Sequence, residues 1–200
     1  SSHGSIKGLG MANNKIISIP WDDRMVTRAQ KKAKSLGRIR NSILRGGGNA
    51  AGYLGEEAVA SYIGAEITSC NKGSDKYDYD IIAKDGRRLE IKTKRRTVYP
   101  QEHFDVSVAK TSVHQRPDLY IFVSIEFARV TMENGRRVYR NIKSICILGQ
   151  AEPEDFFARA KIWREGDIDG RNGFRTHVDM YNLPISEIDP LDDSLLPQKQ

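Results

Sequence analysis

The chain contains few cysteines and no long hydrophobic run. Cys70 and Cys146 are its two cysteines, which are too few for a disulfide framework and lack the spacing of a metal site. No apolar stretch approaches the roughly 18 residues that span a membrane, and no secretory leader is visible. We therefore expect a cytoplasmic protein with buried, reduced thiols, no membrane partner and no small-molecule cofactor.

The composition is typical of one globular domain with an excess of positive charge. Hydrophobic residues make up 38% and charged residues 29% of the 200 residues, and the net charge is +6. Residues 1–10, before Met11, are typical of an expression-vector remnant and are excluded from the reasoning about fold. The excess of positive charge favours a polyanionic partner.

Positive charge is concentrated between Arg24 and Arg45, a segment with eight basic and no acidic residues. Apolar residues recur there at helical spacing, namely Met25, Ala29, Leu36, Ile39 and Ile43. The pattern predicts an amphipathic helix, capped at its start by Asp22 or Asp23. We expect this helix to be a basic N-terminal arm.

We favour DNA contact for the arm, because its like charges repel one another and gain affinity from counterion release at phosphates. The predicted DNA-binding side chains of this segment are Arg28, Lys31, Lys32, Lys34, Arg38 and Arg45. One alternative is a helix packed on the domain with its charges in water. Another is a dimerising helix with Leu36, Ile39 and Ile43 at the seam, which makes a homodimer the second partner expectation.

Residues 46–49 (Gly-Gly-Gly-Asn) predict a flexible joint between the arm and the core. A phosphate-binding loop is excluded, because Ala50 and Ala51 follow the glycines where Lys and Ser or Thr are required. Residues 52–63 then predict a helix. Its Gly52 and Gly55 would allow a close approach to the sheet.

The stretch from Tyr77 to Arg96 predicts two strands joined by a tight turn. Ile81, Ile82 and Ala83 suit a buried first strand, and apolar and charged residues alternate through residues 89–94 in the second. Residues 84–86 (Lys-Asp-Gly) between them are turn material.

The length of this turn decides which side chains share a face. A two-residue loop would set Asp80 across from Ile91, on the face away from Glu90. A three-residue loop with Gly86 in the left-handed conformation sets Asp80 opposite Glu90 and Asp78 opposite Lys92. We prefer the second register.

The preferred register brings two carboxylates together. At about 4 Å they repel by roughly 4 kcal/mol at an effective dielectric near 20. A divalent cation turns this repulsion into binding energy, and Mg²⁺ takes one or two protein carboxylates and keeps several waters. One such water can serve as a nucleophile, with Lys92 on the same face. The alternative is a solvated strand face of mixed charge.

Asp80 followed by Glu90-Ile91-Lys92 resembles the signature of the PD-(D/E)XK nuclease superfamily. The resemblance reaches upstream to residues 52–57 (Gly-Tyr-Leu-Gly-Glu-Glu), which are similar to the helix preceding the core strands of Holliday-junction resolvases and Mrr-like restriction enzymes. It covers roughly residues 52–127. It implies an α/β protein with a restriction-endonuclease-like core, in which helices flank a central mixed β-sheet.

The family comparison leaves two positions open. Members usually take a third carboxylate from the Glu after the second Gly, which is Glu56 here, with Glu57 a near-equal candidate. They usually carry Pro or a small residue before the first Asp, whereas Tyr79 precedes Asp80. This departure leaves Asp78 as a rival to Asp80.

The resemblance implies a Mg²⁺-dependent DNA endonuclease in which Mn²⁺ can substitute. Asp80, Glu90, the Ile91 carbonyl and Glu56 would bind the metal, and Lys92 would position the attacking water and stabilise the transition state. Cleavage selective for junctions or branched DNA is one expectation about substrate. The alternative function is a nucleic-acid-binding protein that keeps the nuclease fold without cleaving.

The remaining chain supplies further strands, a helix and more basic residues. Lys94, Arg95 and Arg96 are predicted to bind phosphate beside the metal. Residues 118–127 predict a buried strand beside the hairpin, and a helix that opens at Glu152 is expected to pack Trp163 on the sheet. We expect an arm and joint at residues 11–49, a nuclease-like domain at 50–186, and an acidic tail at 187–200 that is poorly ordered at its end.

Overall fold

A computed structural model of the chain describes residues 15–39, 47–67, 80–110, 117–171, 173 and 175–198. These residues form a mixed α/β fold with two β-sheets and three α-helices. The helices are α1 (Asp23–Ile39), α2 (Gly47–Ile63) and α3 (Pro153–Arg159). Among the described helices, none has the length and apolar character needed to cross a membrane.

The larger sheet is central and mixed, with the order β1-β7-β6-β4-β3-β2. Its strands are β1 (Ile17–Ser18), β2 (Glu66–Ile67), β3 (Ile81–Ile82), β4 (Arg88–Arg96), β6 (Leu119–Glu133) and β7 (Arg136–Ala151). β6 runs parallel to β4, and the other neighbours are antiparallel. The predicted buried strand is therefore confirmed as the first half of β6, and it lies beside the hairpin.

A second, smaller sheet was not predicted. It has the order β5-β9-β8, with β5 at Asp105–Ala109, β8 at Lys161–Trp163 and β9 at Met180–Pro184. The expectation that Trp163 belongs to the helix after Glu152 is wrong, because α3 ends at Arg159 and the chain continues extended into β8. The sequence from Lys161 is short and carries no periodicity that separates helix from strand.

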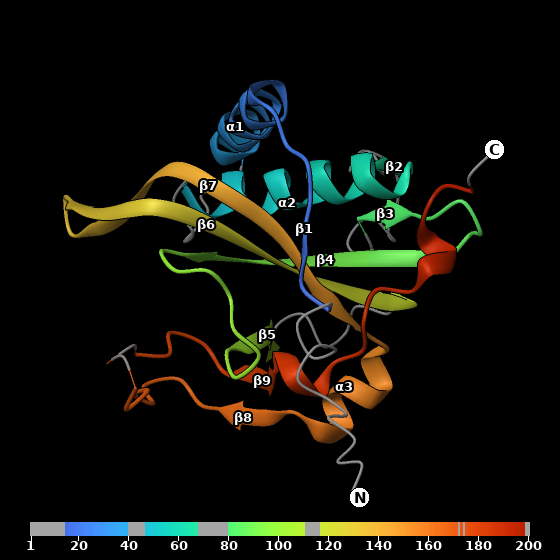
Figure 1. Cartoon of the computed structure of the whole chain (residues 1–200). Helices are drawn as coiled ribbons and strands as arrows, with labels where there is room; N and C mark the ends of the chain where they lie inside the picture. The colour runs from blue at the N-terminus through green and yellow to red at the C-terminus, as the bar shows by residue number, and fades with distance from the viewer. Residues whose placement is uncertain are drawn as a thin grey trace, which may run out of the picture.

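The described elements form layers on the two faces of the central sheet (Figure 1). α2 lies on one face with α1 outside it, and the second sheet and α3 lie on the other face. Each interface has its own core of buried side chains. Leu54, Val59 and Ile91 belong to the helix-side core, and Tyr120, Phe122 and Phe156 belong to the core facing the second sheet. Cys146 is buried there, as expected for a reduced thiol.

α2 rests directly on β4 at a glycine. A Cβ atom on Gly55 would lie 2.1 Å from the Thr93 hydroxyl oxygen and 3.2 Å from the Thr93 Cβ. The close approach predicted for Gly55 is therefore confirmed. The same prediction for Gly52 is wrong, because a Cβ there would meet nothing within 4 Å.

Two predicted flexible segments are structured where the structure describes them. α2 begins at Gly47, so the expected joint at residues 46–49 is largely the first turn of a helix, and Gly46 lies outside the described residues. The acidic tail packs on the domain over its described part, and residues 199–200, at the end expected to be poorly ordered, lie outside the described residues. Leu191 and Leu195 are buried in the helix-side core. One 3₁₀ turn, η3 (Ile185–Glu187), leads into the tail, and a second, η4 (Asp193–Leu195), lies within it. The packing depends on these two leucines, which stand among acidic residues in the sequence.

Candidate active site

The β3–β4 hairpin has the register that the sequence favoured. Ile81 pairs with Leu89 and Ile82 with Arg88, and the Ala83 amide donates to the Arg87 carbonyl at 2.8 Å. The loop between them is three residues long, and Gly86 has φ of 90°. A residue with a side chain rarely adopts this backbone conformation. Continuing the same pairing sets Asp80 opposite Glu90.

Asp80 is held at the start of the hairpin by the backbone of β4. Its amide donates to the Leu89 carbonyl, and its Oδ2 accepts from the Ile91 amide, both at 2.9 Å. The carboxylate is thereby fixed beside the second strand. Asp78, its rival in the sequence, lies outside the residues that the structure describes, so that alternative stays open.

Glu90 is a buried acid on the same strand as Lys92. The residue is 7% exposed, and the Lys92 ammonium lies 3.3 Å from its Oε1. Its other oxygen, Oε2, is buried and accepts from no N–H or hydroxyl donor among the described residues, and Asp80 is the neighbouring carboxyl group. A buried carboxylate oxygen without a donor costs about 1–3 kcal/mol or more, so this oxygen marks a position that a ligand can satisfy.

Glu56 and Glu57, equivalent in the sequence, point to different partners. Glu56 lies against Asp80 and 3.6 Å from the Lys32 ammonium of α1, and its side chain is 12% exposed. Glu57 instead accepts from Arg28 of α1 at 3.0 Å near the surface. The structure therefore brings Glu56, and not Glu57, together with the hairpin carboxyls.

The three clustered carboxyl groups resist ionisation. Burial, and then the negative charge of Asp80, raise the pKa of Glu56 and the pKa of Glu90 to about 8 each. Burial also raises the pKa of Asp80, although the Ile91 amide opposes that rise. Lys32 and Lys92 pull in the other direction at Glu56 and Glu90. At neutral pH without a cation, the cluster therefore retains protons shared between neighbouring carboxyls.

The chemistry of this donor set fits a hard divalent cation. Carboxylate oxygens are the ligands that Mg²⁺ prefers, and a positive charge would let Glu56 and Glu90 ionise and would give Oε2 of Glu90 a partner. Within the described part of the chain, no three His, Cys, Asp or Glu side chains stand in a ready-made ligand arrangement. The carboxyls contact one another around Asp80 instead.

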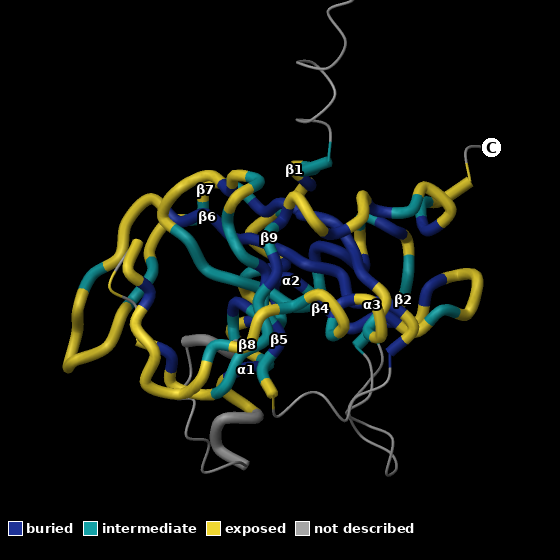
Figure 2. The backbone as a smooth tube through the Cα atoms, turned by 90° about the horizontal axis from the view of Figure 1, so that it is seen from below, coloured by how far each residue is buried: buried dark blue, intermediate teal, exposed yellow. Residues whose placement is uncertain are grey.

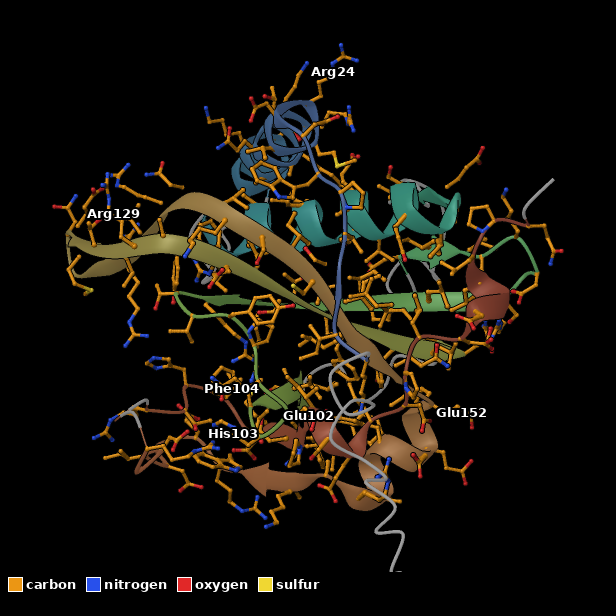
Figure 3. The ribbon with its side chains drawn as sticks, viewed as in Figure 1. Arg24, Glu102, His103, Phe104, Arg129 and Glu152 are labelled. Carbon is orange, nitrogen blue, oxygen red and sulfur yellow. The ribbon has the colours of Figure 1, made fainter. Side chains whose placement is uncertain are left out.

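The predicted arm is a helix packed on the domain. Met25, Ala29 and Ala33 of α1 are buried, and the Asp22 carboxylate accepts from the Met25 amide at 2.9 Å, which identifies Asp22 as the cap. This outcome matches the packed-helix alternative. Arg24 points outward from the top of the molecule (Figure 3).

The predicted DNA-binding residues of α1 divide into two groups. Arg28 and Lys32 form ion pairs with Glu57 and Glu56, while Lys31 and Lys34 are exposed. Arg45 and the Arg38 side chain lie outside the described residues. The side chains of the proposed dimer seam (Leu36, Ile39, Ile43) also lie outside them, so DNA contact and dimerisation both stay predictions.

Lys94 and Arg96 lie between the two sheets and not on an open surface. Both donate to the Asp105 carbonyl, at 3.0 Å from Lys94 and 2.8 Å from Arg96. Burial, and then the charge of Arg96, lower the pKa of Lys94 to about 7. Arg95 points to the opposite face, 4.5 Å from the centre of the Tyr139 ring. These residues hold β4 to its neighbours.

Lys32 is the partner that sequence reasoning missed. It was assigned to DNA, yet its ammonium also faces Tyr53, 4.5 Å from the ring centre, next to Glu56 on α2. No local spacing connects residues 32 and 56, so the contact follows from the packing of α1 on α2 and left no signal in the sequence.

Comparison with protein-family models and with curated protein sequences finds no match for this chain.

Proposed function

We propose that the protein is a Mg²⁺-dependent DNA endonuclease that hydrolyses phosphodiester bonds. One observation carries the proposal: Glu56, Asp80 and Glu90 converge from a helix and a hairpin, and Oε2 of Glu90 is buried without a donor among the described residues. The ion pair of Glu90 with Lys92 involves Oε1 only and leaves Oε2 without this partner. Clustered acids that burial and mutual repulsion keep from ionising are typical of functional sites.

The residues of the cluster divide the work of hydrolysis. When bound, Mg²⁺ supplies a water of lowered pKa and neutralises charge at the scissile phosphate. Asp80 and Glu90 would hold the ion, together with the Ile91 carbonyl and, directly or through water, Glu56. Lys92 orients the attacking water and stabilises the charge that develops on phosphate, an effect commonly equivalent to several kcal/mol. The resemblance to the PD-(D/E)XK superfamily implies products with 5′-phosphate and 3′-hydroxyl ends.

The arrangement of the central sheet supports a restriction-endonuclease-like fold for this chain. The carboxyl-bearing hairpin is antiparallel, and β6 follows it in parallel beside β4. α2, which carries Glu56, precedes the hairpin in the chain and covers the same sheet (Figure 1). α2, the β3–β4 hairpin and β6 follow one another in the chain in the same order as the corresponding sequence motifs.

Plasmid nicking with Mg²⁺ tests the proposal. Lys92→Ala and Glu56→Gln are each expected to lower the nicking rate by about 100-fold or more, because the first removes a group that acts on the transition state and the second removes a proposed metal ligand. Glu57→Gln is the matched control: it neutralises the adjacent acid, which pairs with Arg28 at the surface, and should retain nicking within about twofold.

Circular dichroism and thermal melts of all three variants check that the fold is intact. Retained nicking in a folded Lys92→Ala variant contradicts the assignment. A panel of supercoiled plasmid, linear duplex, single strand, flap and four-way junction, each with Mg²⁺ and with Mn²⁺, tests the further proposal that the enzyme selects branched DNA.

A second candidate function is nucleic-acid binding without cleavage. Lys32 and Lys92 already lie beside two of the three carboxyls, and such internal neutralisation would suit a site that has no metal. Calorimetric titration with Mg²⁺ discriminates between the two. The nuclease proposal expects saturable binding with proton release near pH 7, because the carboxyls must lose their protons to bind. The binding-protein alternative expects neither.

A further inference from the structure

The β6–β7 hairpin extends beyond the layers of the molecule. Its outer part, residues 128–143, is here called the ribbon. Figures 1 and 2 both show the ribbon reaching past the rest of the described chain at the left of the view, and Figure 2 shows it largely exposed. The strands join through a two-residue turn at Asn134 and Gly135, whose φ values are 52° and 73°. The end of the ribbon is therefore narrow.

The ribbon is strongly basic for a structure of its size. It has five basic residues against the single acid Glu133, and they are Arg129, Arg136, Arg137, Arg140 and Lys143. Arg129 and Arg140 stand directly opposite each other in the ladder, an arrangement of like charges that destabilises a sheet. Glu133 pairs with Arg140. Arg129 and Arg137 make no ion pair with any residue that the structure describes.

Apolar side chains are exposed on the other face of the ribbon. Val130 and Met132 alternate with the charged positions, so they share the face of their ladder partners Tyr139 and Arg137. Val130 is 41% and Met132 is 66% exposed. A lone exposed apolar residue needs no explanation, but two on one strand of a projecting basic hairpin indicate a surface that meets a partner.

The dimensions and charge of the ribbon select the partner. Six residues of strand, 128–133, extend about 20 Å, and the two strands lie about 4.8 Å apart. The major groove of DNA is about 12 Å wide and admits a two-stranded β-ribbon. Unpaired guanidinium groups suit the phosphates that border the groove, and apolar side chains suit the base edges and thymine methyl groups inside it.

We propose that the ribbon is a DNA-binding arm that enters the major groove of duplex DNA. Val130 and Met132 contact the floor of the groove, and Arg137 contacts a phosphate from the same face of the ribbon. Arg129 and Arg136, on the opposite face, reach phosphates along the borders of the groove. The proposal takes its partner, duplex DNA, from the function proposed above and adds a contact surface outside the candidate active site.

The ribbon also fixes where the DNA lies relative to the carboxyl cluster. Glu90 is the ladder partner of Tyr120, and nine residues of the same strand separate Tyr120 from Arg129, which is labelled on the ribbon in Figure 3. That length is on the order of 30 Å, or about nine base pairs at 3.4 Å each. The ribbon should therefore protect duplex about nine base pairs from the cleavage position.

Fluorescence anisotropy with a labelled 30-base-pair duplex tests the ribbon separately from cleavage. The protein carries Asp80→Asn and the buffer holds EDTA, so that no hydrolysis occurs. Adding R129Q/R136Q/R137Q should weaken binding at least tenfold at about 150 mM salt and lower the salt slope by about 2–3, or about 0.9 per lost phosphate contact. V130S/M132S should weaken binding with an unchanged slope, because no phosphate contact is lost.

The matched control, R159Q/K161Q/R164Q, removes the same charge from α3, from β8 and from the residue that follows β8, in the layer away from the ribbon (Figure 1). It should bind within about twofold of the parent. Equal weakening by both triple variants, or no weakening by the ribbon variant, overturns the proposal, as does a preference of the ribbon for single-stranded RNA or an acidic protein.

The two proposals fail in different ways. If the wild-type protein binds duplex through the ribbon but never nicks plasmid with Mg²⁺, the ribbon proposal stands and the nuclease proposal is wrong. If a ribbon variant binds and nicks as the wild type does, the ribbon proposal is wrong and the nuclease proposal stands.

Discussion

The two ends of β4 bury charge of opposite sign and treat it differently. At Glu90 an excess of carboxyl groups meets around Asp80, and one buried oxygen has no donor among the described residues. Further along the same face of β4, two basic side chains, Lys94 and Arg96, lie close together. Both donate to the Asp105 carbonyl, and Arg171 pairs with the carboxylates of Asp105 and Asp169 nearby.

The difference lies in how many neighbouring groups of opposite sign each end has. At the basic end Lys94 and Arg96 each donate to the Asp105 carbonyl and so connect β4 to β5, although the Nε of Arg96 is buried without a partner among the described residues. At the acidic end the carboxyls keep protons, and Oε2 of Glu90 accepts from no N–H or hydroxyl donor among the described residues, as expected for the cation site proposed above. Burial alone therefore does not identify a site; the balance of donors and acceptors does.

Removing one carboxylate from each end should have the largest contrasting effect. Asp80→Asn is expected to abolish stabilisation by Mg²⁺, which for wild type amounts to about 2.7 kcal/mol at a hundredfold excess over Kd. Asp105→Asn keeps the backbone carbonyl that accepts from Lys94 and Arg96 and should retain that stabilisation. Thermal melts with and without Mg²⁺ measure both. A full response in folded Asp80→Asn would break the comparison.

The two ends should also give stability opposite dependence on pH. Without metal, Glu90 keeps its proton in the folded state up to about pH 8 but loses it near 4.5 when unfolded. The folded state then binds more protons, so stability falls as pH rises through this window. Lys94 is protonated below about 7 when folded and below 10.5 when unfolded, so its contribution makes stability rise between those values.

Two variants separate these slopes. Glu90→Gln should remove part of the fall between pH 5 and 8, and Lys94→Met should remove the rise above pH 7, each on the order of 2 kcal/mol. Denaturant melts in EDTA at pH 5, 7 and 9 report both slopes. A Glu90→Gln protein with the slope of the wild type contradicts the account of the acidic end.

The smallest effects concern the contact between α2 and the middle of β4. Gly55→Ala places a methyl group against Thr93 and should cost about 1–3 kcal/mol. Gly52→Ala, three residues earlier in the same helix, has open space and should gain about 0.5–1 kcal/mol from helix propensity. Urea melts of the pair measure this, and equal effects of both substitutions would show that the close packing is not required.

Local chemistry made the hairpin and the acid pair predictable. The turn residues at 84–86 fixed the register, and register alone placed Asp80 opposite Glu90. The helical period likewise predicted α1 and α2. The choice between Glu56 and Glu57 was not predictable, because adjacent residues on a helix differ only in which way they face, and that depends on how α1 packs.

The second sheet and the tail show the same limit. β5 and β9 lie far apart in the sequence and pair only in the folded chain. Leu191 and Leu195 are core positions that were not predicted, because the residues around them are acidic. Glycines at 46–49 suggested a joint because propensity disfavours them in helices, yet packing of α2 outweighed that cost.

The packed tail makes the candidate site depend on a remote part of the chain. Arg87, at the end of the β3–β4 turn, donates to Asp192 at 3.0 Å, a partner 105 positions away, and the Leu195 side chain lies in the core beside it. A fragment that stops before Ile188 would lose the Arg87–Asp192 contact and the packing of Leu195, while it would keep every acidic residue of the cluster. The distances between its carboxyl groups should then vary. Limited proteolysis of the tail should therefore first weaken the Mg²⁺ binding that is proposed for the cluster.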